Sequence, residues 1–68
     1  MSDHVYRLSE IVGSSPNSVD EAIRTAITKA AQTVWNIEWF QTEEIRGQVV
    51  DAGVAYFQVR LKIGFRVD

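Results

Sequence analysis

Residues 54–67 alternate between apolar and polar side chains almost without interruption, and no other segment constrains the fold as strongly. One set of side chains comprises Ala55, Phe57, Val59, Leu61, Ile63, Phe65 and Val67; the other comprises Tyr56, Gln58, Arg60, Lys62, Gly64 and Arg66. A period of two is typical of a strand with one buried face. The sequence therefore predicts a sheet whose apolar face is covered by another element, while its polar face is free for solvent, a ligand or another subunit.

An amphipathic helix is the element available to cover that face. Ser18 is a typical N-cap, and Glu21 three residues later predicts a capping box. Apolar side chains then recur at helical spacing, at Val19, Ala22, Ile23, Ala26, Ile27, Ala30, Ala31 and Val34. Half of this stripe is alanine, so we expect the helix to lie close to the sheet.

Two further strands are predicted, one on each side of the helix in sequence. Residues 5–13 form the first, followed by a turn at 14–17; residues 38–50 form the second, and Asp51-Ala52-Gly53 joins it to the third as a short hairpin. A helical crossover makes the first two strands parallel, and we expect the long apolar third strand to lie between them. The predicted fold class is α+β: a β-α-β-β protomer with a three-stranded antiparallel-type sheet packed on one helix.

A chain of 68 residues predicts a single domain, residues 1–68, with a small core. The absence of cysteine excludes disulfides and thiolate metal sites, and His4 is a lone histidine without ligand spacing around it. Oligomerisation is then the remaining way to stabilise the domain, through the open sheet edges and the bare sheet face.

The charge pattern argues against several classes of partner. The net charge is −2 and the seven Lys and Arg residues are scattered, which disfavours nucleic-acid binding. We recognise no signal peptide and no apolar run of membrane-spanning length, so a cytoplasmic location without a membrane partner is expected.

An enzymatic role has little support. The sequence contains no plausible Ser-His-acid set, no phosphate-cradling glycine loop and no metal-ligand spacing. Glu43 and Glu44 are adjacent on a strand and are expected on opposite faces, so they cannot form a paired-carboxylate site in one copy.

Several short segments resemble one known family in their order and spacing across nearly the whole chain. They are Val12-Gly13-Ser14-Ser15-Pro16, Ala30-Ala31-Gln32-Thr33, Trp39-Phe40, Ile45-Arg46-Gly47, Phe57-Gln58-Val59 and Lys62-Ile63-Gly64-Phe65-Arg66. Together they resemble the dodecins, a family of small flavin-binding proteins. The resemblance implies a hollow homododecamer that binds FMN or riboflavin as stacked pairs between subunits. It also implies flavin storage or buffering and quenching of the excited flavin, without turnover of a substrate.

Four residues match positions that contact flavin in this family. Trp39 resembles the stacking tryptophan; a core role is the alternative, but the adjacent Phe40 faces the other way and only one of the two can face the helix. Gln58 matches the glutamine that pairs with the pyrimidine edge of the flavin, where its amide offers a donor beside an acceptor. Arg46 and Arg66 match arginines near the phosphate, which favours FMN over riboflavin; a salt bridge at the rim, the usual role of an arginine on a strand, is the alternative for either.

Strand parity raises one difficulty with this set. On an unbroken strand, Arg46 and Trp39 would face opposite sides of the sheet. A bulge near Gly47, or a phosphate contact from a different subunit, would resolve the conflict. Gln58 and Arg66 share a face and are therefore the stronger candidates. Trp35 departs from the family pattern, and we assign it no flavin contact.

A structural or interaction module is the alternative function. An oligomeric α+β domain that binds protein or another small molecule on its polar sheet face would account equally well for the small core and the open edges. It would not account for the joint occurrence of Trp39, Gln58 and Arg66. Flavin binding by the purified protein distinguishes the two readings.

Overall fold

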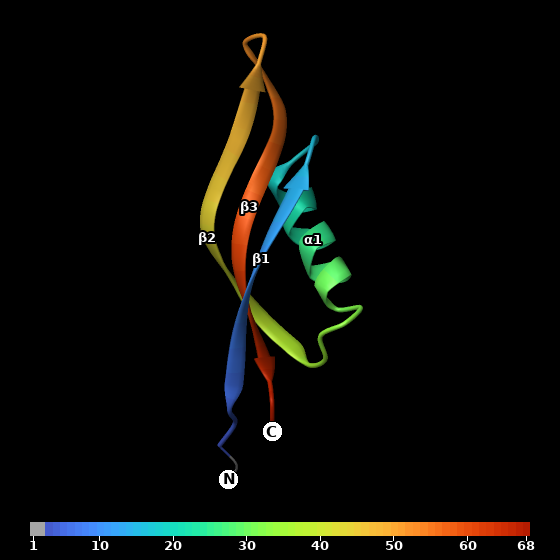
Figure 1. Ribbon diagram of the computed structural model, residues 1–68, viewed down its shortest axis with the longest axis vertical. Helices are drawn as coiled ribbons and strands as arrows, with labels where there is room; N and C mark the ends of the chain where they lie inside the picture. The colour runs from blue at the N-terminus through green and yellow to red at the C-terminus, as the bar shows by residue number, and fades with distance from the viewer. Residues whose placement is uncertain (1–2) are drawn as a thin grey trace.

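The computed structural model describes residues 3–68 and shows one helix packed on one face of a three-stranded sheet (Figure 1). The elements are β1 (Tyr6–Ser15), α1 (Val19–Ala30), β2 (Ile37–Val50) and β3 (Gly53–Arg66). β3 is the central strand and pairs antiparallel with both neighbours. The predicted α+β class, the order of the elements and the central third strand are confirmed. The expectation that the N-terminal segment is no signal peptide includes Met1 and Ser2, which lie outside the described residues.

Two element boundaries differ from the prediction. β1 continues through Ser15, which pairs with Phe57 instead of starting a turn. The helix ends at Ala30 and is followed by a turn, although the apolar pattern continues to Val34. Asn36 has a φ of 61°, a left-handed conformation that asparagine tolerates better than most residues, and it directs the chain into β2.

The core is a thin layer between α1 and the centre of the sheet. Val59 and Leu61 of β3 are fully buried against Ala22 and Ala26 of the helix. A Cβ on Gly13 of β1 would lie 2.7 Å from the Ala26 Cβ, so the helix touches the strand backbone. The close approach predicted from the alanine stripe is therefore confirmed, as is the apolar face of β3.

Glu21 joins the start of the helix to the end of β1, but not through the predicted reciprocal capping box. Ser18 Oγ accepts a hydrogen bond from the Glu21 N–H at 3.0 Å, as expected of an N-cap. The Glu21 carboxylate instead accepts from Ser15 Oγ and from Asn17 Nδ2. These two hydrogen bonds lower the pKa of the Glu21 carboxyl below its usual value.

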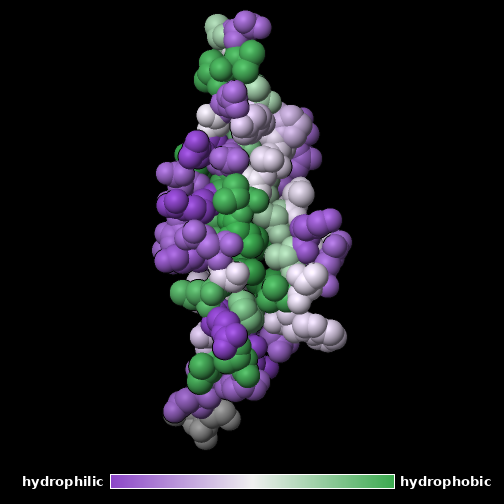
Figure 2. All heavy atoms as spheres, viewed as in Figure 1, coloured by the Kyte–Doolittle hydropathy of each residue, from purple (hydrophilic) through white to green (hydrophobic). Residues whose placement is uncertain are grey.

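Much apolar surface lies outside this core. Only five hydrophobic residues are classed as buried in the described part of the chain, and twelve large ones are exposed. Beyond the last pair of β1, strands β2 and β3 continue as a two-stranded ribbon that carries exposed Val49, Val50 and Val54 (Figures 1 and 2). An isolated two-stranded ribbon is marginally stable in water, so this end of the protomer needs a further contact. Within residues 3–68, no helix is long and apolar enough to span a membrane.

The hairpin turn gives the first testable prediction. Val50 pairs with Gly53, so the loop has two residues rather than the expected three, and its φ angles are 51° at Asp51 and 63° at Ala52. A left-handed alanine is strained by about 1–2 kcal/mol, whereas glycine adopts this conformation freely. Glycine also loses more chain entropy than alanine on folding, which offsets part of this gain. Ala52→Gly should therefore raise the free energy of unfolding by about 0.5–1 kcal/mol. Thermal unfolding measures the gain; Ala55→Gly on the adjoining strand is the control and should lower the melting temperature.

Candidate functional site

An extra residue in β2 changes the direction of the side chains along that strand. Thr42 pairs with Leu61 and Glu44 pairs with Arg60, although Leu61 and Arg60 are consecutive in β3. Glu43 is therefore the additional residue of a β-bulge. Side chains before and after the bulge no longer follow one alternating pattern.

The bulge places Trp39 and Arg46 on the same face of the sheet. Trp39 lies opposite Gly64, and Arg46 lies opposite Gln58. Directly paired residues point to the same side, and Gly64 and Gln58 both belong to the polar face of β3. The parity conflict is thus resolved by a bulge, which lies at Glu43 and not next to Gly47.

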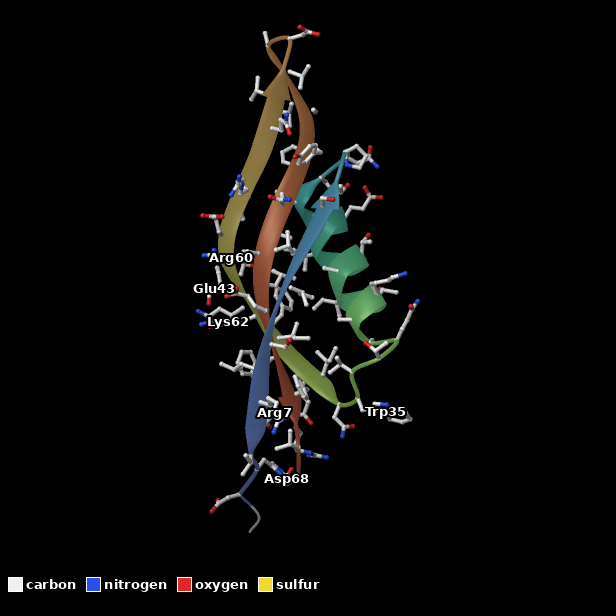
Figure 3. The ribbon with its side chains drawn as sticks, viewed as in Figure 1. Arg7, Trp35, Glu43, Arg60, Lys62 and Asp68 are labelled. Atoms are coloured by element: carbon white, nitrogen blue, oxygen red, sulfur yellow. The ribbon has the colours of Figure 1, made fainter. Side chains whose placement is uncertain are left out.

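The same bulge overturns the expectation for Glu43 and Glu44. Both reach cations of the polar face, instead of pointing to opposite sides of the sheet. The Glu43 carboxylate lies 3.0 Å from Lys62 Nζ, and the Glu44 carboxylate lies 3.7 Å from an Arg46 guanidinium nitrogen. Figure 3 shows Glu43, Lys62 and Arg60 gathered on one side of the protomer. Because each carboxylate has a cation beside it, the pair does not form an acid–base site.

Trp39 lies across the backbone of β3 at Gly64. A Cβ on Gly64 would overlap Cε2 and Cζ2 of the indole, so only glycine leaves room for this ring position. Trp39 as a residue is 40% exposed, and the Tyr6 ring lies beside its indole with a centroid separation of 6.5 Å and an interplanar angle of 60°. Trp39 is therefore a partly open aromatic surface and not a core residue.

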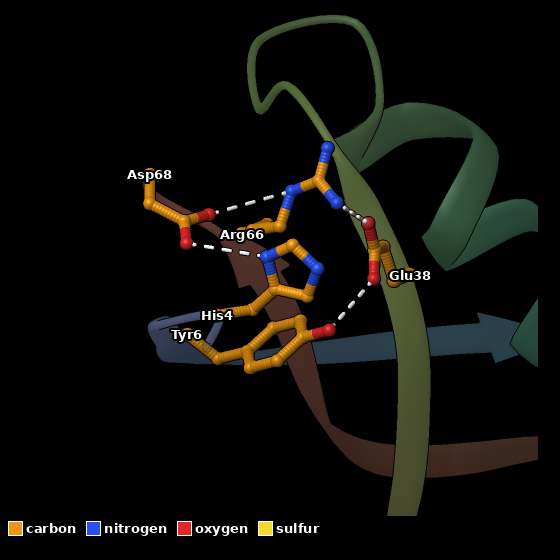
Figure 4. Close-up of polar contacts among 5 residues, drawn as sticks. All are labelled: His4, Tyr6, Glu38, Arg66 and Asp68. Carbon is orange, nitrogen blue, oxygen red and sulfur yellow. Dashed lines mark hydrogen bonds and ion pairs between the residues drawn. The ribbon is translucent and has the colours of Figure 1, made fainter. Parts of the chain in front are cut away.

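Arg66 belongs to a polar network that joins all three strands, and Tyr6, the neighbour of the indole, is part of it (Figure 4). A terminal guanidinium nitrogen of Arg66 lies 3.6 Å from Glu38 Oε2, and Nε lies 3.5 Å from Asp68 Oδ1. Nε is buried, and within residues 3–68 no group forms a hydrogen bond of normal geometry with it. Tyr6 Oη donates to Glu38 Oε1 at 2.9 Å, and His4 Nδ1 lies 3.2 Å from Asp68 Oδ2. Arg66 thus has two carboxylates beside it within its own protomer.

This network shifts two pKa values. The hydrogen bond to Glu38 raises the pKa of the Tyr6 phenol, and loss of solvent and the negative charge of Glu38 add to the effect. For Asp68, loss of solvent acts to raise the pKa of the carboxyl, but the hydrogen bond and charge of His4 outweigh it and the net shift is downward. The phenol is therefore held neutral as a hydrogen-bond donor.

Gln58 and Arg46 form a second polar pair farther along the same face. They are direct cross-strand partners, with Ser14 of β1 on the other side of Gln58. Within residues 3–68, the Gln58 amide forms no side-chain hydrogen bond, and the Arg46 side chain is 66% exposed with its one carboxylate at 3.7 Å. Both side chains are available to a ligand.

One protomer does not bring these groups into one pocket. Gly64 and Gln58 are six residues apart on β3, which corresponds to roughly 20 Å between the Trp39 end and the Gln58 end. A groove of about 340 Å³ lies elsewhere, beside the helix, and none of the four predicted site residues lines it. A site that contains both Trp39 and Gln58 therefore needs at least two copies of the chain.

Three contributors to the Trp39 end were not identified from the sequence. Gly64 was placed correctly on the polar face but given no role, and Tyr6 and Glu38 were not considered. Tyr6 pairs with Arg66 in the antiparallel register of the first and third strands, but the sequence does not specify this register. In the described part of the chain, no group of three or more metal-ligating side chains is close enough to hold a metal ion.

Comparison with known proteins identifies one family. Residues 5–68 match the family model for dodecin. A protein named dodecin from Thermus thermophilus is 41% identical over 64 residues, which are 94% of this chain and 93% of that protein. The solved structure of a dodecin from Streptomyces davaonensis is 51% identical, covers 98% of both chains and superposes with a TM-score of 0.92. A solved calcium dodecin from Mycobacterium tuberculosis, described as having a novel calcium-binding site, is 28% identical over 94% of this chain and 91% of that chain, with a TM-score of 0.81.

Gly64→Ala tests the position of the Trp39 indole. The new methyl group would displace the ring, because overpacking at a tight contact costs about 1–3 kcal/mol. In a Trp35→Phe background, which leaves Trp39 as the one tryptophan, we expect a changed emission maximum and easier quenching by iodide. Gly53→Ala is the matched control, since its nearest neighbour outside the adjacent residues is 3.8 Å from the added carbon. An unaltered Trp39 spectrum in Gly64→Ala would contradict the stacking over Gly64.

Proposed function

This chain belongs to the dodecin family, and we propose that it is a flavin-binding protein that stores flavin and quenches its excited state. The observation that carries the proposal is the partly open Trp39 indole, held over Gly64 on the same face as Gln58 and Arg46. The proposed ligand is FMN. Riboflavin, which has no phosphate, would bind without the contact between phosphate and arginine.

The residues present suit such a ligand. Trp39 offers one side of its ring to an aromatic system while Gly64 supports the other. Gln58 carries an unengaged amide that can donate to and accept from the pyrimidine edge. Arg46 is an exposed guanidinium for the phosphate, and Arg66 is a second one that must share its charge with Glu38 and Asp68.

The site is proposed to form between copies of the chain. The roughly 20 Å between Trp39 and Gln58 in one protomer is too long for a single flavin ring system to contact both. A homo-oligomer also covers the exposed valines of the hairpin, and we propose the hollow dodecamer implied by the family. A bound flavin would supply a light-absorbing ring that accepts an electron. Trp39 would place an electron-rich indole against that ring, and electron transfer from the indole would suppress flavin emission.

The relative named calcium dodecin raises the question of a metal ligand instead. Two acidic side chains near the aromatic end of this surface are engaged by cations, Glu43 by Lys62 and Glu38 by Arg66. Among residues 3–68, no three acidic or histidine side chains gather closely enough to hold a metal ion, whereas the Trp39 ring and the Gln58 amide are open. The donor set of this face therefore favours a flat organic ligand over Ca²⁺, which prefers six to eight oxygen ligands.

Titration of FMN with the purified flavin-free protein tests the proposal. We expect saturable loss of FMN fluorescence, with Trp39→Ala weakening binding by about 0.5–1.5 kcal/mol per stacked pair and restoring emission in the complex that remains. Trp35→Phe is the control and should change neither quantity. Absence of quenching by the assembled wild-type protein would refute the flavin function and leave the interaction module as the alternative.

The two arginines are separated by comparing FMN with riboflavin. Loss of a charge-assisted contact of about 1.5–3 kcal/mol predicts a drop in FMN affinity of about tenfold or more for Arg46→Ala, with riboflavin binding and the melting temperature unchanged. Arg66→Ala should also reduce FMN affinity, but it removes the cation beside Glu38 and leaves Asp68 with His4 as its partner, so it should lower the melting temperature as well. Equal losses for FMN and riboflavin would mean that the arginine concerned supports the assembly rather than the phosphate.

A further inference from the structure

Tyr6, Trp39 and Glu38 form a chain of contacts that the binding function does not use. The Tyr6 ring lies next to the Trp39 indole, with centroids 6.5 Å apart, and its hydroxyl donates to Glu38 Oε1 at 2.9 Å. An electron donor in contact with the indole thus has a proton acceptor already at hydrogen-bond distance. Figure 4 shows the phenol directed at the carboxylate.

We propose that Tyr6 and Glu38 act as a redox relay that restores Trp39 after the indole has lost an electron. The Tyr6 phenol gives one electron to the oxidised indole, and its hydroxyl proton passes to Glu38 Oε1 along the existing hydrogen bond. The relay rests on the proposed function in one respect: the oxidant that takes the electron from Trp39 is then a light-excited flavin. The electron and proton transfers themselves belong to these three side chains.

The step is balanced within the network. A Trp39 radical cation gains one electron and becomes a neutral indole; if its N–H proton has gone to water, that proton returns with the electron. Tyr6 loses one electron and one proton and becomes a neutral phenoxyl radical. The Glu38 carboxylate gains the proton and becomes a carboxylic acid, so the separated charges of the indole and the carboxylate disappear together. In the flavin-bound protein, the electron that the excited flavin took from Trp39 would return to the Tyr6 phenoxyl radical as Glu38 gives back the proton, which restores the starting state.

The hydrogen bond to Glu38 is what makes Tyr6 an easier electron donor than an isolated phenol. Oxidised phenols are strong acids, so oxidation without a nearby base is unfavourable in a partly desolvated site. The raised pKa of the Tyr6 phenol agrees with a neutral donor facing a negative carboxylate. Arg66, 3.6 Å from the other Glu38 oxygen, holds the carboxylate in position without occupying Oε1.

Tyr56 provides a comparison within the same chain. It is the other tyrosine, and its hydroxyl donates to Gln48 Oε1 at 2.7 Å. An amide oxygen accepts the hydrogen bond but is far too weak a base to keep the proton. Tyr56 also lies eight residues from Gly64 on β3, roughly 26 Å from the Trp39 position. It matches Tyr6 in chemistry but lacks both the indole contact and the base.

Pulse radiolysis of the flavin-free protein tests the relay without any flavin. Azide radicals oxidise the indole in a Trp35→Phe background, and the decay of the indole radical is followed together with the growth of the tyrosyl radical. We expect the two signals to be coupled within the protein and the transfer to slow at least tenfold in Tyr6→Phe. Tyr56→Phe should retain the rate of the Trp35→Phe background.

Glu38→Gln separates proton acceptance from ring packing. The amide can still accept the Tyr6 hydrogen bond but cannot keep the proton, so we expect slower electron transfer from Tyr6 to the indole. In the Trp35→Phe background, the same transfer should be slower in deuterated water than in ordinary water. Peptide mapping after radical exposure should find more oxidised Trp39 in Tyr6→Phe than in Tyr56→Phe. An unchanged transfer rate in Tyr6→Phe, or loss of transfer in Tyr56→Phe, would overturn the relay. The FMN titration is independent of this result, so failure of one proposal is distinguishable from failure of the other.

Discussion

The pairing register between β2 and β3 is the constraint on which the proposed site depends. Phe40 and Ile45 lie opposite Ile63 and Val59 on the helix-facing side of the sheet, although they are five positions apart and an unbroken strand would turn one of them away. The bulge at Glu43 satisfies both positions. The Glu43–Lys62 ion pair is partly exposed and contributes little. Phe40 and Ile45 remain 47% and 58% exposed, so they lie at the margin of the core. The orientation of Trp39 and Arg46 on the opposite face is a consequence of this pairing register.

The thinness of that core explains why the functional face is also expected to be an assembly surface. Leu61 and Val59 are fully buried in a cluster whose centre on the helix is two alanines, which allows close packing but leaves the core small. The hairpin extends past β1 with exposed valines, including Val49 and Val54. A protomer with these properties gains stability by association, and a site divided between two ends of the protomer is completed by the same association. Binding and assembly are thus expected to stabilise each other.

The sequence predicted well those features that depend on local periodicity. The amphipathic helix and the alternating third strand are repeated over many residues, and they were sufficient to place Gln58 and Arg66 on one face. The strand order was predicted correctly, but the detailed register between distant residues was not, since the bulge expected near Gly47 lies at Glu43. The extra residue at Glu43 is invisible in a strand pattern, since it follows from the sum of all contacts between β2 and β3. The left-handed Ala52 contradicts local preference, and the loop length that requires it is set by the register of the flanking strands.

The two ends of the proposed site differ in the number of carboxylates near their arginines. This difference would link the charge of a bound ligand to the pair of Tyr6 and Trp39. At the Trp39 end, Arg66 is balanced by two carboxylates, whereas Arg46 at the Gln58 end has one, at 3.7 Å, and its side chain is 66% exposed. A ligand phosphate would therefore be more readily held by Arg46, where fewer carboxylates oppose it. A phosphate that drew Arg66 away from Glu38 would leave that carboxylate with Tyr6 as its remaining partner and strengthen the hydrogen bond between them. The charge of the bound ligand would in that way control how readily Tyr6 gives up its proton.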